Sequence, residues 1–197
     1  MFVDYEILIA WGSVAKKYKK GEYIFHEGDL PKFFFQVIEG SVKIFNTNNE
    51  GREFTQGAFN VGDSFGEPLL FIDELYPSNA ITLEDSVIIK LSKDKFFAIL
   101  DEYPNLQKKL IHVFAERIWN KSTTSRDIIN TNPESRIISF LKAYKKKIKK
   151  EGEDIEIPYT RQQIANYTGL RVETVIRALA KMKIKKSVQI VKRKLIY

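Results

Sequence analysis

The residues with the most specific spacing in this chain lie between Thr160 and Met182. Thr160 is a good helix N-cap, and Gln163 stands three residues later, at the position that completes a capping box. Gly169 permits a tight turn between this helix and a second one predicted at 171–182. The small and apolar residues around the turn have the spacing of a helix-turn-helix, namely Ile164, Ala165, Leu170, Val175 and Leu179. The chemistry predicted for such a motif is recognition of base edges in the major groove of DNA.

The charged residues are divided unevenly along the chain. Residues 1–132 hold 15 Lys and Arg against 19 Asp and Glu, whereas residues 133–197 hold 17 against 6. The formal net charge of +7 is therefore a net of −4 joined to a net of +11. A strongly basic C-terminal third favours nucleic acid or an acidic membrane surface as a partner. Charge alone also leaves open a solvated helix face that is rich in lysine.

Several classes of site are excluded by the residue types that the chain lacks. It has no cysteine, so it cannot hold a disulfide, a cysteine-ligated zinc ion or a cysteine-held iron–sulfur cluster. His26 and His112 are too few and too far apart in sequence to indicate a metal site. The sequence contains no nucleophile–base cluster and no Walker loop, so we expect no catalytic residues and no enzyme activity.

Targeting and membrane-spanning patterns are also missing from the sequence. No run of about 18 apolar residues occurs, so we expect no membrane partner. Residues 1–6 lack the basic start and the apolar core of a signal peptide. These patterns predict a cytoplasmic protein.

The elements that must position the helix-turn-helix begin with a β-rich segment. Residues 1–15 are predicted as a short helix whose apolar face includes Val14. Between residues 18 and 91, short apolar runs are separated by turns that contain Gly, Asn or Asp, which is typical of a barrel or sandwich. Ser92 is a predicted N-cap for the helix that follows.

A long helix is predicted from Pro104 to about residue 131, where Asn132 and Pro133 interrupt it. Residues recur every three or four positions in a stripe that begins apolar and becomes polar: Leu106, Leu110, Val113, Arg117, Lys121, Thr124 and Ile128. Two interpretations of this stripe stay open, a dimer seam or a face that packs on the β-rich segment. After it come a predicted helix over 135–148, a short strand at 155–158 and a hairpin wing around Lys192 and Arg193.

Taken in order, these segments resemble the Crp/Fnr family of bacterial transcription regulators over nearly the whole chain. The resemblance rests on segments 20–29, 37–43, 61–70, 83–86, 160–165 and 172–179. It implies an α+β fold with a jelly-roll-like β-barrel sensor domain of the cyclic-nucleotide-binding type at 1–103. A long dimerisation helix at 104–132 and a winged helix-turn-helix at 133–197 complete the fold that the family implies. The homodimer of this family would place two recognition helices about 34 Å apart, which favours a palindromic operator in double-stranded DNA.

The resemblance also assigns residues to the DNA interface. The base-reading positions of the family fall on Arg171, Val172, Glu173 and Arg177. An Arg can bridge O6 and N7 of guanine, and a Glu can accept from N4 of cytosine, whereas Val172 can contact at most a thymine methyl. An ion pair between Glu173 and Arg177 is the alternative role of those two residues, and it is compatible with base reading. Phosphate contacts are expected from Thr160, Arg161, Gln162, Thr174, Lys192 and Arg193.

The cyclic-nucleotide site of the family is matched only in part. Gly66 and Glu67 match the start of its phosphate cassette, in which the Glu would accept the ribose hydroxyl. Ser78 also matches, but Pro77 stands where the phosphate-binding Arg is expected. Without that Arg, a phosphate loses a bidentate, charge-assisted contact, so we expect neither cyclic AMP nor another cofactor. The other candidates for an effector pocket are Asn79, Lys121 and Ser122.

The resemblance therefore predicts a dimeric, sequence-specific DNA-binding transcription regulator that cyclic AMP does not control. RNA polymerase is an expected further partner of such a regulator. The alternative is a nucleotide-binding regulatory module that acts through a protein partner. A basic helix-turn-helix argues against the alternative, because such a module has no need of one.

Overall fold

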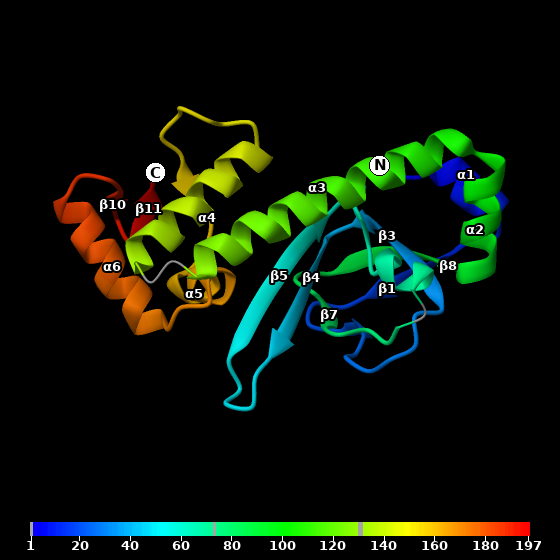
Figure 1. Cartoon of the computed structure of the whole chain (residues 1–197), viewed down its shortest axis with the longest axis horizontal. Helices are drawn as coiled ribbons and strands as arrows, with labels where there is room; N and C mark the ends of the chain where they lie inside the picture. The colour runs from blue at the N-terminus through cyan, green and yellow to red at the C-terminus, as the bar shows by residue number, and fades with distance from the viewer. Residues whose placement is uncertain (1, 73, 130–131) are drawn as a thin grey trace. The chain divides into compact units, whose positions relative to one another are not determined.

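The chain forms two compact units, Met1–Ile118 and Trp119–Tyr197 (Figure 1). The structure is a computed structural model that describes residues 2–72, 74–129 and 132–197, with the side chains of 124–129 left out. Helix α3 (Pro104–Ile129) starts at the predicted proline and contributes residues to both units.

The first unit is built on two antiparallel sheets of four strands each. Their strand orders are β1-β8-β3-β6 and β2-β7-β4-β5. The strands are β1 (Val14–Tyr18), β2 (Tyr23–Phe25), β3 (Phe33–Glu39), β4 (Ser41–Thr47), β5 (Glu53–Asn60), β6 (Ser64–Phe65), β7 (Asn79–Thr82) and β8 (Ser86–Ser92). The predicted α+β class and jelly-roll-like fold are confirmed, although the strand pairing of the described residues does not close the two sheets into one barrel.

Short helices complete the first unit. They are α1 (Tyr5–Ala10), the 3-10 helix η1 (Glu67–Phe71) and α2 (Lys93–Glu102). The prediction of one helix over 1–15 is wrong at its end, because Gly12 turns the chain with a φ of +74° and Val14 then pairs with Lys90 of β8. Ser92 is the N-cap of α2, as predicted, but its side chain makes no capping hydrogen bond.

Consecutive residues of β3 serve two different cores, because side chains alternate between the faces of a strand. Phe34 packs with Phe96 of α2, their ring centroids 4.4 Å apart, in a cluster under α1, α2 and α3. Phe35 packs with Phe65 at 5.4 Å, in a cluster that lies between the two sheets. Burial of each large apolar side chain contributes about 1.5–3 kcal/mol, so both faces of this sheet hold the unit together.

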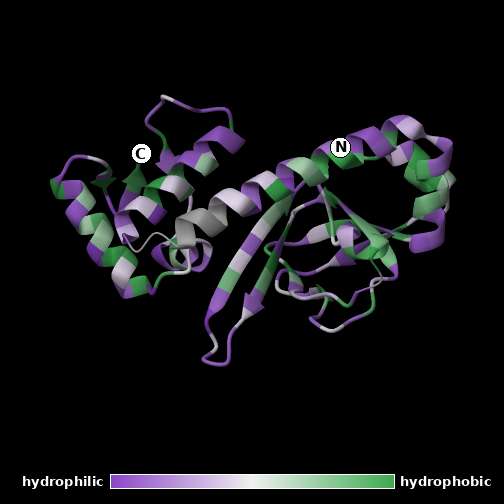
Figure 2. Ribbon diagram, viewed as in Figure 1, coloured by the Kyte–Doolittle hydropathy of each residue, from purple (hydrophilic) through white to green (hydrophobic). Residues whose placement is uncertain are grey.

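The second unit consists of three helices and a small sheet besides its part of α3. Its elements are α4 (Pro133–Lys147), β9 (Glu156–Ile157), α5 (Arg161–Thr168), α6 (Val172–Ile184), β10 (Gln189–Val191) and β11 (Lys194–Ile196). Helix α4 begins two residues earlier than predicted, because Asn132 caps it and Pro133 suits the first helical position. The sheet has the order β10-β11-β9. Figure 2 shows hydrophilic residues along the loop after α4, and the last turn of this helix contains Lys145, Lys146 and Lys147.

Candidate nucleic-acid interface and effector site

Helix α5 is fixed at both ends by its own residues. At its start, Thr160 Oγ1 accepts from the Gln163 backbone N–H at 3.1 Å, and Gln163 Oε1 accepts from the Thr160 N–H at 2.8 Å. At its end, Thr168 Oγ1 donates to the carbonyl of Ile164 at 2.7 Å, and Gly169 takes a left-handed φ of +66°. The capping box and the tight turn predicted from the sequence are both confirmed.

Helix α6 buries one face and leaves the other in solvent. Its buried residues are Val175, Ala178, Leu179 and Met182. Glu173 and Arg177 are exposed one helical turn apart, and Arg171 is exposed at the N-cap position. The ion pairs formed by the described residues do not join Glu173 to Arg177, so both side chains are available for base edges.

Two of the residues on α6 that were predicted to contact DNA are partly buried in the protein. Val172 is half-buried and packs against the core of the second unit. Thr174 is also half-buried. Val172 thus has a packing role that the sequence analysis did not assign, and its spacing of three residues from the buried Val175 was the available signal.

The predicted phosphate contacts lie in α5 and in the wing. Gln162 is exposed and donates to Asn166 Oδ1 at 2.9 Å, while Arg161 reaches the carbonyl of Arg193 at 3.4 Å. Lys192 and Arg193 form the turn between β10 and β11, both with left-handed φ values, of +48° and +68°. Two such residues in succession give the type I′ turn of a tight hairpin, which confirms the predicted wing and leaves both side chains exposed.

Glu67 lies in the first unit, at the position predicted for an effector pocket. Other side chains of the protein bond its carboxylate. The side chain is fully buried, and its Oε1 accepts from Arg117 Nη1 at 2.7 Å and from Ser64 Oγ at 2.7 Å. Arg117 also donates to the Ser64 carbonyl at 2.7 Å and lies over the Phe59 ring. One of the two oxygens of the carboxylate that would accept a ribose hydroxyl therefore already has two donors.

Tyr76 fills space beside Glu67. Its ring stacks on Phe25 with centroids 3.7 Å apart, and a methyl group at Gly66 would lie 3.3 Å from its hydroxyl. That hydroxyl and Glu67 Oε2 are buried and have no hydrogen-bond partner among the described residues. Burial raises the pKa of Tyr76 well above its usual range, and the carboxylates of Glu67 and Asp29 add to the effect. A cyclic phosphate would meet a neutral phenol and a carboxylate here, and the Arg117 guanidinium is already bonded to that carboxylate and to the Ser64 carbonyl, so the residues present do not fit that group.

The other predicted effector residues do not complete a phosphate site. Ser78 is buried, whereas the neighbouring Pro77 is exposed and its carbonyl accepts from the Asn46 side chain. Asn79 Oδ1 accepts from the Glu27 backbone N–H at 3.1 Å. Lys121 and Ser122 are exposed on the part of α3 that belongs to the second unit. Sequence reasoning missed the roles of Arg117 and Tyr76, although an arginine at the point where the stripe changes from apolar to polar was a visible signal for Arg117.

The stripe predicted on α3 packs against the first unit in its apolar part. Leu110 is buried in the core under α1 and α2, with Leu106 and Val113 packed beside it, and Arg117 reaches Glu67. The side chains of Thr124 and Ile128 lie outside the described residues. A different apolar stripe of α3 is exposed to solvent. The exposed fractions of its side chains are 67% for Ile111, 66% for Ile118 and 66% for Trp119. The dimer-seam interpretation of the predicted stripe is therefore wrong for Leu106, Leu110 and Val113, which serve the core.

The two histidines lie apart from each other and from acidic clusters. His26 stacks on Tyr23 with ring centroids 4.3 Å apart, and His112 Nε2 lies 3.4 Å from Glu116 Oε1. Within the described ranges, no group of three or more His, Asp or Glu residues is placed to hold a metal ion.

Comparison with known proteins assigns both units. The cyclic nucleotide-binding domain family matches residues 15–103, and the Crp-like helix-turn-helix domain family matches residues 135–197. The chain belongs to the Crp/Fnr family. Proteins of this family are DNA-binding transcription regulators that act as dimers, so the predicted class is confirmed over that of an enzyme.

Curated Crp/Fnr relatives and solved structures agree with this assignment. The fumarate and nitrate reduction regulatory protein of Salmonella typhi is 26% identical over 169 residues, covering 84% of this chain and 67% of its own length. Electron transport regulator A of Shewanella oneidensis is 28% identical over 173 residues, with the same coverage of both chains. The c-di-GMP responsive regulator CLP of Xanthomonas campestris is 20% identical, covers 97% of this chain and 96% of its own, and has a TM-score of 0.82. At that identity, the likeness to CLP establishes the fold alone.

In the parts of the chain that the structure describes, no helix combines the length and the apolar character needed to cross a bilayer.

Proposed function

We propose that this Crp/Fnr protein is a homodimeric regulator that reads a palindromic operator through α6 and is not controlled by cyclic AMP. The observation that carries the proposal is the exposed face of α6, which holds Arg171, Glu173 and Arg177 free of ion pairs among the described residues. Two guanidinium groups and a carboxylate on one helix can read guanine and cytosine by hydrogen bonds in the major groove.

The wing and the start of α5 would supply the sequence-independent part of the binding. Lys192 and Arg193 are exposed at the hairpin turn, and Arg161 and Gln162 are at the first turn of α5. Cations and amides at such positions neutralise or bond phosphates and set the register of the recognition helix. The net charge of +11 in residues 133–197 supports the same role.

The dimer would form along the exposed stripe of α3. Ile111 and Ile118 are two helical turns apart and Trp119 is beside them, and each has about two thirds of its surface in solvent. Large apolar side chains in a row on a helix are commonly buried against a partner helix. A dimer made here would leave Leu106, Leu110 and Val113 in the core of each subunit.

The interior of the first unit supports independence from cyclic AMP. Arg117 and Ser64 already bond Glu67, Tyr76 stacks beside it, and Pro77 replaces the expected Arg. A phosphate placed here would lie near the Glu67 carboxylate, and the one guanidinium described beside it, that of Arg117, is already paired with that carboxylate. RNA polymerase is the protein partner that we propose for the regulator, with the cytoplasm as its place of action.

Selection of bound sequences from a random double-stranded DNA pool tests this function. We expect a palindrome to be enriched. Its sequence and its yield should be the same without cyclic AMP and with cyclic AMP at about 1 mM, a concentration that would occupy even a weak site. Enrichment of no sequence would contradict the regulator assignment. Enrichment that requires cyclic AMP would contradict only the statement about the effector.

A further inference from the structure

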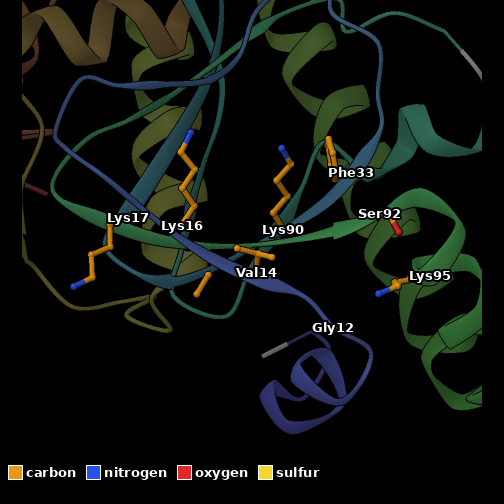
Figure 3. Close-up of a pocket in the computed structure, with 9 residues that line it drawn as sticks. Gly12, Val14, Lys16, Lys17, Phe33, Lys90, Ser92 and Lys95 are labelled. Atoms are coloured by element: carbon orange, nitrogen blue, oxygen red, sulfur yellow. The ribbon is translucent and has the colours of Figure 1, made fainter.

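A basic pocket of about 590 Å³ opens on the first unit, and its lining residues are separate from those of the DNA interface and from Glu67 (Figure 3). Its wall is made by β1, β3, β8 and the start of α2. Four lysines line it, namely Lys16, Lys17, Lys90 and Lys95, and no acidic residue is among the lining residues. A concave site of this volume is within the usual range of small-molecule pockets, about 300–1,000 Å³.

The strand register explains why two of the lysines converge. Val14 pairs with Lys90, and Lys16 pairs with Ile88, across the antiparallel β1–β8 ladder. Because directly paired residues share a face, Lys16 and Lys90 are on the face that carries Ile88 and the core between the sheets. Figure 3 shows the Lys16 and Lys90 side chains extending in the same direction, with Phe33 next to Lys90, whereas Lys95 of α2 points towards Gly12 and Lys17 extends away from the other two lysines.

The charges of this pocket are not compensated inside the protein. The ion pairs of the described residues include none of the four lysines. Lys90 Nζ lies 3.6 Å from the centroid of the Phe33 ring, and Lys16 Nζ lies 4.5 Å from that of Tyr18. Burial and the nearby charge of Lys16 lower the pKa of Lys90. An anion bound on this face would be attracted by both ammonium groups, because Lys16 and Lys90 share the face and neither has an ion-pair partner among the described residues.

The lining also has an apolar part that a simple anion would not use. Val14, Ala15 and Phe33 form it, next to the lysines. We propose that this pocket is an effector site for a phosphorylated small molecule with an apolar ring, such as a nucleotide, at a place separate from Glu67. Lysines suit the phosphates as point charges, and the apolar wall covers the ring.

Isothermal titration of the full-length protein in about 0.15 M salt tests the proposal, because this salt screens loose surface attraction. The probes are ATP, GTP and adenosine. We expect at least one of the two nucleotides to bind once per chain, and adenosine not to bind. In the double variant Lys16→Met/Lys90→Met, the nucleotide affinity should fall at least tenfold, on the order of 1.4 kcal/mol.

The matched control is Lys20→Met/Lys108→Met, which removes the same charge from two exposed lysines outside the pocket. It should keep the wild-type nucleotide affinity, and both double variants should keep the wild-type affinity for operator DNA. Operator binding is measured separately, so failure of this proposal is distinguishable from failure of the proposed function. The variant Arg171→Ala/Arg177→Ala should also keep the nucleotide affinity, since Arg177 is in α6 and Arg171 is its N-cap residue, both outside the pocket lining.

Four outcomes would overturn the proposal. The first is that neither ATP nor GTP binds at millimolar concentration. The second and third are a loss of nucleotide affinity that is equal in the two lysine double variants, or one that is confined to the Arg171→Ala/Arg177→Ala variant. The fourth is that a hexaglutamate peptide binds, with Lys16 and Lys90 required, while the nucleotides do not. The last outcome would assign the pocket to an acidic protein segment instead. Retained nucleotide binding with selective loss in Lys16→Met/Lys90→Met would support it.

Discussion

Single side chains on α6 decide which bases the protein reads. Arg177 is exposed and free of ion pairs among the described residues, so its guanidinium can bridge O6 and N7 of one guanine. We expect Arg177→Ala to weaken binding to the selected operator by about 1–3 kcal/mol, and to relax the preference at one base pair of each half-site. Fluorescence anisotropy with operators that carry single base changes measures both effects.

Lys183→Ala is the control for this variant, because Lys183 is an exposed cation in the last turn of the same helix. It should lower affinity for all sequences by a similar factor, if it has any effect. Arg177 would not be a base reader if its removal weakened every operator variant equally.

The buried hydroxyl of Tyr76 is predicted to cost stability. It has no hydrogen-bond partner, so Tyr76→Phe should raise the free energy of unfolding by about 1 kcal/mol at neutral pH. The pKa of Tyr76 is raised in the folded state, whereas the tyrosine of the unfolded chain ionises near its ordinary pKa of 10.0. The wild-type protein therefore loses stability as the pH rises through and above 10, because ionisation then favours the unfolded chain. The gap between variant and wild type should therefore widen from pH 8 to pH 11 in urea unfolding.

Tyr5→Phe is the matched change at an exposed tyrosine and should leave stability within about 0.5 kcal/mol of wild type. A gap that stays constant from pH 8 to pH 11 would contradict the role given to ionisation of Tyr76. Loss of stability in Tyr76→Phe at neutral pH would mean that the hydroxyl has a partner.

At the scale of elements, Arg117 ties α3 to β6 and η1. Its removal leaves the fully buried Glu67 without its cation, so Arg117→Met should destabilise the protein by about 3 kcal/mol in urea unfolding. Adding Glu67→Gln should restore a large part of the loss, because no buried charge then lacks a partner. Equal stabilities of the single and double variants would show that the charge of Glu67 is not the cause.

The exposed stripe of α3 is the surface on which dimerisation can be tested. Ile118→Glu places a charge in the proposed seam, so we expect sedimentation velocity to detect monomers where the wild type is dimeric. Asn105→Glu adds the same charge at an exposed position in the first turn of α3 and should leave the dimer intact. A dimer that survives Ile118→Glu, and also the same change at Ile111, would place the seam elsewhere.

At the scale of the whole molecule, two-fold symmetry should fix the distance between half-sites. Two recognition helices of a dimer reach major grooves about one turn apart, roughly 10 base pairs. Inserting about five base pairs in the centre of the operator turns one half-site to the opposite side of the DNA. Affinity should then fall to that of a single half-site in a gel-shift titration, whereas unchanged affinity would indicate that the subunits bind independently.

The sequence by itself determined the parts whose contacts are local. The capping box of α5 joins residues three apart, Gly169 needs only its own left-handed φ, and the wing turn is set by two adjacent residues. Interactions of this kind appear in the sequence as fixed spacings, so the helix-turn-helix and its wing were predictable. The family motifs added the jelly-roll-like fold, and the charge division pointed to the DNA-binding end.

Only the tertiary structure decided which side of α3 faces the core and what occupies the effector site. Two apolar stripes run along α3, and periodicity alone cannot tell which one packs inward, because both have helical spacing. Arg117 and Glu67 are 50 residues apart in sequence, and Tyr76 meets Phe25 from still another segment. Partners of this kind are selected when distant segments pack closely against one another. Many pairings of such segments are possible, and the spacing of residues along the sequence does not show which of them forms.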